Sequence, residues 1–324
     1  MSQPAPARDQ RPAPRKGAFP GQGPGPGQVA GTSFALAAVL MWGLAPVATR
    51  ALVLRLAPLP LLVLRVSIAL VILLPLAVPI LRLLDRRSAL RLVTAGLLGL
   101  VGYNLPLTLG LRWVHAATAA LILGTEPVWI LAMSRVFLRE PVPGWSWGGA
   151  AIAGAGVAVI AGPGALPGGG SAVGSTGLAL AGIALVLLGT ALFAAYTIVL
   201  RPLSARFGPV RATAASTVAG VLPYLLCAGT VAPGQVARLP AAAWGELVFL
   251  AVGCTVGGLL LFSLAVVRIG PARAGLLLYA EPLAGVAGAI WFLGERPPPT
   301  VAAGGLLVMA GVGIAWAAQR RQVS

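Results

Sequence analysis

Charged side chains are scarce in this sequence, which excludes a soluble globular protein. They make up 9% of its 324 residues, whereas a soluble domain carries about 25%. Hydrophobic residues make up 58% of the chain, and the mean hydropathy is +0.93. A chain of this composition could not cover a water-facing surface with polar groups, so we expect a membrane protein.

Residue types that carry catalysis or bind metals are equally scarce. Cys227 and Cys254 lie inside apolar runs without CxxC spacing, which indicates small buried side chains rather than a redox or metal site. The single histidine, His115, falls in a predicted loop, and Asp9 and Asp85 lie outside the apolar runs. The chain also has no GxSxG motif. An intramembrane enzyme is therefore the least favoured function, and we expect neither a cofactor nor a metal.

The net charge of +16 does not indicate nucleic-acid binding. The arginines and lysines are spread over the connecting segments instead of gathering on one module. With the N-terminus in the cytoplasm, 17 of these residues fall on the cytoplasmic side and five on the other. The positive-inside rule then predicts a multi-pass protein of the inner, or cytoplasmic, membrane with both termini in the cytoplasm.

Apolar runs of about 20 residues, the length of helix that crosses a bilayer, recur along the chain. We predict ten of them, and hence an all-α polytopic membrane protein. The predicted spans are 31–50, 59–80, 92–111, 116–137, 145–162, 177–200, 210–230, 244–266, 272–292 and 299–318. Residues 1–30 are expected to form a disordered basic tail, since they lack the apolar core of a signal peptide. Residues 163–176 form a Gly/Pro-rich linker and residues 319–324 a C-terminal tail.

The segment Ala116–Ile160 is written a second time as Pro271–Ala315. Without gaps, 15 of the 45 aligned positions are identical, and Glu126-Pro127 falls on Glu281-Pro282 at an offset of 155. The other matches include Glu140 with Glu295, and Trp42…Arg50 with Phe193…Arg201 at an offset of 151. Five predicted spans in each half force the halves, 31–162 and 177–318, to insert in opposite directions. Two inverted five-helix repeats are a layout of many secondary transporters, with the substrate site near the midplane.

Glu126 and Glu281 each lie near the middle of a predicted span. An ionised carboxylate there costs roughly 2.5–3.5 kcal/mol, so it needs a proton, a partner or water. One interpretation is a site for proton coupling or for a substrate amine. The alternative is a structural carboxylate between helices. Pro127 and Pro282 break the helices beside these carboxylates, either as part of a transport site or as ordinary kinks.

Arg65 is the only basic residue well inside a predicted span. It could pair with a glutamate, bind an anionic group of a substrate, or extend to the membrane surface as an anchor. Its counterpart, Ser216-Thr217, has no cation, so one arginine faces two carboxylates, and we expect one glutamate to titrate while the other is paired. Further side chains in mid-span could line an amphipathic pocket, or could simply pack: Trp42, Asn104, Trp129, Tyr196 and Tyr279.

Stripes of small residues follow the turns that contain Glu140 and Glu295. They comprise Gly149-x3-Ala153 in the first half and Gly304/Gly305…Gly311 in the second. Such stripes allow helices to approach closely, either within the chain or in a homodimer.

The early Trp42-Gly43 helix, Arg65, and the Ala-rich spans with Glu-Pro resemble the EamA-type drug/metabolite transporters. The turn Phe292-Leu293-Gly294-Glu295-Arg296 and the Gly-rich helix after it add to the resemblance, which covers residues 31–318. It implies a ten-helix inner-membrane carrier that moves small metabolites, often outward, by alternating access. Arg139 departs from the pattern, in which glycine is usual at this position of the turn.

We therefore predict a proton-linked secondary exporter. Its expected partners are a small-molecule substrate, membrane lipid and a proton. The alternatives are an uncoupled facilitator or a protein that moves lipids or amphiphiles, and, less favoured, the intramembrane enzyme.

Overall fold

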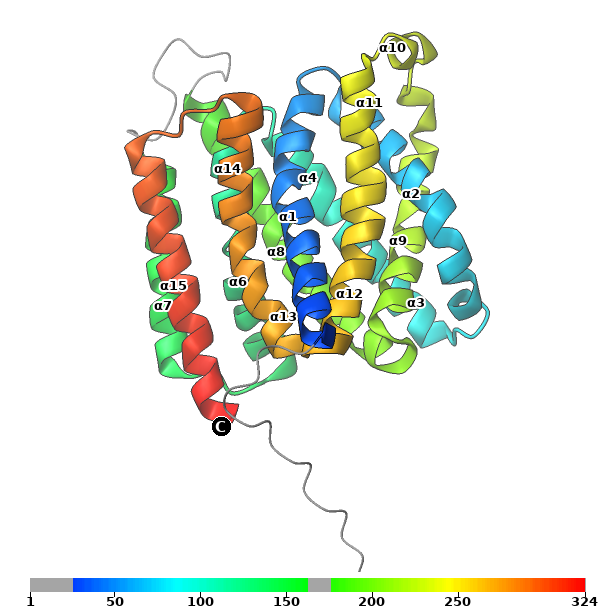
Figure 1. Ribbon diagram of the computed structural model, residues 1–324. Coiled ribbons are helices and arrows are strands. Elements are labelled where there is room, and N and C mark those ends of the chain that lie inside the picture. Colours follow the sequence, from blue (N-terminus) through cyan, green and yellow to red (C-terminus); the bar gives the residue numbers. More distant parts are fainter. Residues whose placement is uncertain (1–25, 163–175, 324) are drawn as a thin grey trace, which may run out of the picture.

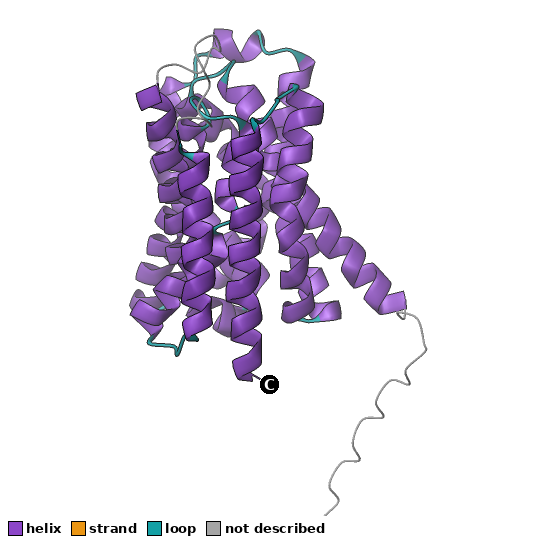
Figure 2. Ribbon diagram, turned by 90° about the vertical axis from the view of Figure 1, so that its left-hand side faces the viewer, coloured by secondary structure: helices purple, strands orange, loops and turns teal. Residues whose placement is uncertain are grey.

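The computed structural model describes residues 26–162 and 176–323, and all regular structure in these ranges is helical (Figure 2). The elements of the first half are α1 (Pro26–Val53), α2 (Pro58–Leu81), α3 (Arg86–Gly96), the π-helical η1 (Leu97–Gly102), α4 (Tyr103–Gly110), α5 (Ala116–Leu123), α6 (Glu126–Met133), the π-helical η2 (Ser134–Leu138) and α7 (Gly144–Ile160).

The second half has the same order of elements, with a short excursion between its second and third long helices. Its elements are α8 (Thr176–Phe207), α9 (Pro209–Leu226), the 3₁₀ turn η3 (Ala228–Thr230), α10 (Pro233–Ala237), α11 (Ala241–Val248), the π-helical η4 (Phe249–Gly257), α12 (Gly258–Ile269), α13 (Pro271–Leu277), the 3₁₀ turn η5 (Leu278–Ala280), α14 (Glu281–Leu293) and α15 (Pro299–Val323).

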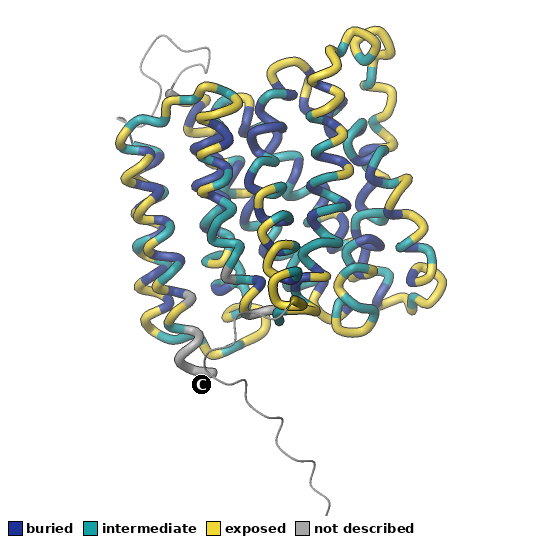
Figure 3. Tube along the Cα trace, viewed as in Figure 1, coloured by how far each residue is buried: buried dark blue, intermediate teal, exposed yellow. Residues whose placement is uncertain are grey.

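Seven helical segments of the described chain are long and apolar enough to cross a membrane. They are Pro26–Val53, Pro58–Leu81, Arg86–Gly110, Ala116–Leu138, Gly177–Phe207, Ala241–Ile269 and Arg273–Leu293, and two shorter apolar helices are Gly144–Ile160 and Pro299–Ala315. Many large apolar residues of these helices are exposed, as expected for contact with lipid, and Figure 3 shows exposed residues all along the bundle.

The first helix starts earlier than the sequence predicted, at Pro26 instead of near residue 31. Proline suits the first turn of a helix, where its missing N–H would have no intrahelical partner. The predicted tail of residues 1–30 therefore ends in helix. Its residues 1–25, and positions 163–175 of the predicted linker, lie outside the described residues.

Successive long helices run in opposite directions between two ends of the molecule (Figure 1). We call the end where α1 starts and α15 finishes the terminal end, and the other the distal end. The α1–α2, α4–α5 and α14–α15 turns lie at the distal end. The α2–α3, η2–α7, α8–α9 and α12–α13 turns lie at the terminal end. The equivalent segments Glu126–Leu138 and Glu281–Leu293 thus point in opposite directions.

Helices of the two halves pack on each other throughout. The principal pairs are α7 with α15, α1 with α12 and α14, α2 with α9, α4 with α8, and α5 with α14. Between α7 and α15 the small-residue stripes are in contact. A Cβ added at Gly149 would lie 2.5 Å from the nitrogen of Ala315, and one at Gly304 would lie 2.7 Å from the carbonyl oxygen of Gly156. The stripes therefore serve close packing within the chain.

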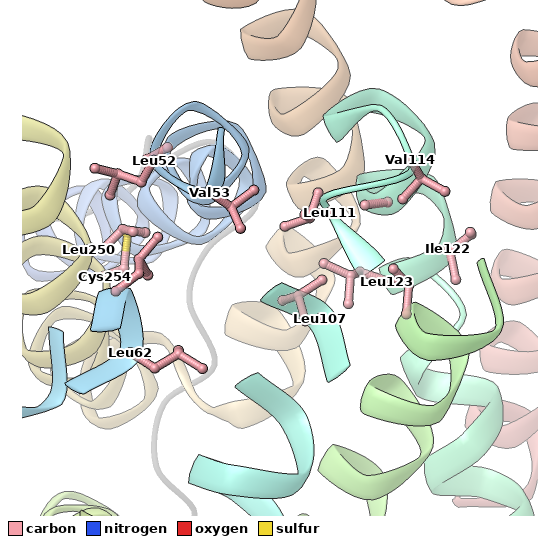
Figure 4. Close-up of a cluster of buried hydrophobic side chains, with 14 of the residues drawn as sticks. Leu52, Val53, Leu62, Leu107, Leu111, Val114, Ile122, Leu123, Leu250 and Cys254 are labelled. Atoms are coloured by element: carbon pink, nitrogen blue, oxygen red, sulfur yellow. The ribbon is translucent and has the colours of Figure 1, made fainter. Parts of the chain in front are cut away.

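A large apolar cluster joins both halves (Figure 4). It contains Leu52 and Val53 from the distal end of α1, Leu250 and Cys254 from η4, and Leu107, Leu111, Val114, Ile122 and Leu123 from α4, α5 and the turn between them. This cluster holds together the third helices of both halves, which carry part of the candidate site.

Candidate functional site

Arg65 lies on α2 and bridges the two halves. Its Nη1 donates to Asn104 Oδ1 (3.1 Å) on α4, and its Nη2 donates to Thr255 Oγ1 (3.3 Å) on η4. Among the residues that the structure describes, no ion pair joins Arg65 to a carboxylate. The side chain therefore points inward to two neutral partners, rather than outward to the membrane surface. Since a guanidinium has five N–H donors, these two hydrogen bonds leave capacity for a ligand.

Two of the three π-helical segments in the described chain, η1 and η4, supply carbonyl groups that bind the two partners of this arginine. A π-helical turn is wider than an α-helical turn and occurs frequently at functional sites. Asn104 Nδ2 donates to the oxygens of Gly99 (3.2 Å) and Leu100 (3.1 Å), and the Tyr224 hydroxyl also donates to Leu100 (3.1 Å). These bonds fix the carboxamide of Asn104, so that its oxygen faces the arginine.

The π-helical segment of the second half is bonded in a similar way. Trp42 Nε1 donates to the oxygen of Cys254 (2.9 Å), and the hydroxyl of Thr255 donates to the oxygen of Leu250 (2.9 Å). Trp42 lies directly over Gly258, where an added Cβ would be 2.8 Å from its Cε2 atom. Only glycine at this position lets α1 and the start of α12 approach so closely.

Glu126 and Glu281 each lie at a helix break, as predicted. α5 ends at Leu123 and α6 begins at Glu126, while η5 separates α13 from α14, which begins at Glu281. Both side chains are half-buried, and the two carboxyl groups are close enough to interact electrostatically. Pro127 and Pro282 occupy the first turns of the new helices, where a missing N–H is tolerated.

Tyr103 interacts electrostatically with four of these groups. The carboxyl groups of Glu126 and Glu281, the guanidinium of Arg65 and the thiol of Cys254 all lie within electrostatic range of its hydroxyl. The ring of Tyr103 packs against Phe193, with centroids 4.9 Å apart. The sequence analysis missed Tyr103, although its position beside Asn104 and in the middle of a predicted span was a usable signal.

The predicted aromatic residues divide into two groups. We call Arg65, Tyr103, Asn104, Glu126, Thr255 and Glu281 the polar centre. Trp42 packs on Phe262 (5.3 Å between centroids), and Tyr196 packs on Phe193 (5.2 Å), so both belong to the shell around this centre. Tyr279 instead directs its hydroxyl to the oxygen of Val312 on α15 (3.4 Å). Trp129 lies half-buried on α6, one turn after the glutamate.

Each end of the molecule also has a charged contact between the halves. At the distal end, the Glu295 carboxylate accepts the N–H groups of Ala116 (2.8 Å) and Ala117 (2.9 Å), at the start of α5. Arg50 is buried there, donates to the oxygen of Leu111 and interacts electrostatically with Glu295. The sequence analysis assigned neither Arg50 nor Glu295 to a site.

At the terminal end, Arg201 Nη1 donates to Glu140 Oε1 (2.7 Å), and this pair is largely exposed. Arg206 Nη1 donates to Asp85 Oδ1 (2.9 Å). Asp85 also caps α3 by accepting the N–H of Ser88. Hydrogen bonds with Ser88 and Arg206 hold the pKa of Asp85 well below its ordinary value.

The described residues contain no group of three or more His, Cys, Asp and Glu side chains that could hold a metal ion. The polar centre and its shell contain one arginine, two carboxylates, hydroxyls, an amide and aromatic rings. Such a set can bind a small polar molecule and exchange protons.

Comparison with known proteins shows the family of the chain. Residues 29–162 and 180–317 match the EamA-like transporter family. A probable terminal-alkyne amino-acid exporter of Streptantibioticus cattleyicolor is 30% identical over 225 residues, which cover 67% of this chain and 69% of that protein. The uncharacterized transporter YyaM of Bacillus subtilis is 22% identical over 199 residues, 61% of this chain and 64% of that protein.

The fold is also found among solved structures. One of them, named only as the crystal structure of a protein, superposes with a TM-score of 0.58 at 20% identity and covers 91% of this chain and 99% of its own. This likeness shows the fold alone. The two family matches together span both halves of the chain, one on each side of residues 163–179. The chain therefore belongs to the EamA-like transporter family and is a multi-pass membrane transporter.

Proposed function

We propose that this protein is a proton-linked secondary exporter of a small metabolite, built from two inverted repeats of five membrane-crossing helices each. The seven long apolar segments, the two shorter apolar helices and α9 make ten crossings. With basic residues concentrated at the terminal end, the positive-inside rule puts that end, and both termini, in the cytoplasm. The membrane is then the cytoplasmic membrane.

The observation that carries the proposal is the charge balance of the polar centre. Two carboxyl groups, those of Glu126 and Glu281, and one guanidinium, that of Arg65, lie within electrostatic range of Tyr103, and the two carboxyl groups also interact with each other. Two negative charges against one positive charge leave a deficit of one positive charge in a poorly solvated place. A proton or a substrate ammonium group can supply it, so competition between the two at this centre would couple export to proton entry.

The same balance supports a zwitterionic substrate such as an amino acid. The free donors of Arg65 suit a carboxylate, since guanidinium binds carboxylates with two parallel hydrogen bonds. Glu126 or Glu281 suits the ammonium group, and the rings of Trp42 and Tyr103 suit an apolar side chain. The name of the relative from Streptantibioticus cattleyicolor, an amino-acid exporter, agrees with this substrate class.

Transport of neutral amino acids in proteoliposomes tests the proposal, and the panel should include one with a terminal alkyne. An imposed pH gradient should drive net movement in the wild type. Glu126→Gln or Glu281→Gln should abolish the pH-driven component, while exchange at equal pH continues in at least one of these variants. Glu246→Gln is the matched control, because Glu246 lies at the distal end, paired with Arg55 at 3.7 Å. It should keep pH-driven transport.

Other outcomes would favour a different function. Movement that is indifferent to the pH gradient in the wild type and in both variants would indicate an uncoupled facilitator. Transfer of fluorescent phospholipid between leaflets, without amino-acid transport, would indicate a protein that moves lipids.

A further inference from the structure

The two glutamate-containing turns have the same backbone but make different contacts. Arg139 (φ 54°) and Gly294 (φ 63°) take the left-handed conformation at equivalent positions. The N–H of Glu140 then donates to the oxygen of Ser134 (3.4 Å), and that of Glu295 to the oxygen of Ala289 (3.1 Å). In both turns, which end a helix, the N–H of the glutamate bonds to the carbonyl oxygen of the residue six positions earlier. The turn itself is therefore unchanged between the copies, and any difference lies in what the carboxylate binds.

The arginine partners of these glutamates are equivalent as well. Arg50 lies in the last turn of α1, and Arg201 lies at the matching position of α8, 151 residues later. At the distal end, Arg50 is only 6% exposed and Glu295 closes the start of α5. At the terminal end, the side chains of Arg201 and Glu140 are 61% and 45% exposed. The arginine is thus buried at the distal end, where its glutamate caps α5, and largely exposed at the terminal end, where its glutamate pairs with it directly.

Helix packing is also tighter at the distal end than at the terminal end. α14 packs along α5, and a Cβ added at Gly285 would lie 2.5 Å from the Cβ of Ala120. The equivalents of α14 and α5 are α6 and α13, and no comparable contact joins them in the described part of the chain. A Cβ added at Gly275, the counterpart of Ala120, would meet nothing within 4 Å. The halves are closed together at the distal end and apart at the terminal end.

Resting on the proposed function, we propose that Arg50–Glu295 and Arg201–Glu140 are two alternating latches of the transport cycle. In this structure the distal latch is closed. In the opposite state, the terminal latch closes: α6 packs along α13, Glu140 moves to the start of α13 and Arg201 becomes buried. There Glu140 accepts the N–H of Ala272 alone, because Pro271, the counterpart of Ala116, has no N–H. Glu295 then leaves the start of α5, and Arg50 and Glu295 become exposed, as Arg201 and Glu140 are in this structure.

A second set of ion pairs provides an internal comparison. Arg55 and Arg206 are also equivalent at an offset of 151, and they pair with Glu246 (3.7 Å) and Asp85 (2.9 Å), respectively. Here the packing at the two ends matches, since α11 contacts α1 and α2 while its counterpart α3 contacts α8 and α9. These pairs do not distinguish the ends and should not act as latches.

Thiol labelling from the distal side tests the latches. Val47 is 5% exposed and packs with Ala116, Ala117 and Ala289 inside the closed distal end, so Val47→Cys reports its opening. The background is Cys227→Ser, and the same protein without the reporter corrects for Cys254, which is buried. The probe is a membrane-impermeant maleimide applied to the protein in proteoliposomes, with no substrate present.

Glu295→Gln should raise the labelling rate on the order of tenfold, the effect of losing a hydrogen bond to a charged group. Adding Glu140→Gln to it should lower the rate again towards wild type, because both states then lose a latch. Glu246→Gln and Asp85→Asn, one at each end, should leave the rate unchanged. A further rise in the double variant, no response to Glu295→Gln, or an equal response in the controls would overturn the proposal.

Two additions keep the outcome interpretable. If Glu295→Gln is not monodisperse in detergent, Glu295→Asp replaces it, since the shorter carboxylate cannot span both N–H groups and should raise labelling in the same direction. The labelling result is also independent of transport. Shifted labelling without pH-driven transport would leave the latches intact and refute the transport proposal. Intact transport without shifted labelling would refute the latches alone.

Discussion

Two neighbouring glycines of α7 should respond in opposite ways to the same added methyl group. A Cβ at Gly149 would lie 2.5 Å from the nitrogen of Ala315, whereas ordinary van der Waals contact begins at 3.4 Å. The obstacle is backbone, so α15 itself would have to move by about 0.9 Å. A Cβ at Gly148 would meet nothing within 4 Å. We therefore expect Gly149→Ala to destabilise the protein and Gly148→Ala to leave it intact or slightly stabilised.

The magnitude follows from these distances. Overpacking of a close contact costs about 1–3 kcal/mol, and the shift would also lengthen the 3.0 Å hydrogen bond from Ser146 Oγ to the oxygen of Ala315. Replacing an unhindered helical glycine by alanine contributes roughly 0.5–1 kcal/mol of stability. The two variants should then differ by at least about 3 °C in melting temperature, at roughly 2 °C per kcal/mol.

Thermal unfolding of the detergent-purified variants, followed by tryptophan fluorescence and by the monodisperse fraction after heating, measures this difference. Both variants have the same composition and differ only in which face of α7 carries the methyl group. Equal melting temperatures, or a lower one for Gly148→Ala, would refute the close packing of α7 on α15.

Three further predictions concern the site and the terminal end. Gly43→Ala should lower the melting temperature by an amount equivalent to about 1–3 kcal/mol, because its methyl group would lie 2.5 Å from the oxygen of Glu281. Trp42→Phe should cost about 0.5–1.5 kcal/mol of stability in the same assay, since it removes the 2.9 Å hydrogen bond to η4. Asp85→Asn should destabilise the protein at pH 7, and the deficit should shrink in melting curves taken as the pH falls below the ordinary pKa of aspartate. The reason is that the pairing with Arg206 lowers the folded-state pKa, so its contribution is complete above the ordinary value and is lost on acidification.

The helices and the duplication were predictable because both depend on local features of the sequence. Apolar runs of bilayer length determine the spans, and the repeated Glu-Pro sets the break at Glu126 and at Glu281. The predicted start of the first helix, near residue 31, was wrong by five residues, since α1 starts at Pro26. Residues 26–30 carry only one large apolar side chain, Val29, and only the helix-starting property of proline indicated that the helix extends that far.

The contacts of the site were harder to predict because they depend on the π-helical turns. A π-helical turn changes the direction of every side chain after it, so spacing on an α-helix does not place Thr255 beside Arg65 or Tyr103 near both glutamates. Arg65 itself was singled out, but its partners in the structure are neutral rather than acidic. Those partners lie 39 and 190 residues away along the chain.

The capping of α5 by Glu295 has a consequence for how the protein is made. The N–H groups of Ala116 and Ala117 and the carboxylate that binds them are separated by 179 and 178 residues. At a synthesis rate of 5–20 residues per second, the first half waits about 10–40 s for this partner to be translated. During that interval the start of α5 and the neighbouring Arg50 remain incomplete in the nascent chain. The amino-terminal half should therefore mature only after almost the whole polypeptide has left the ribosome.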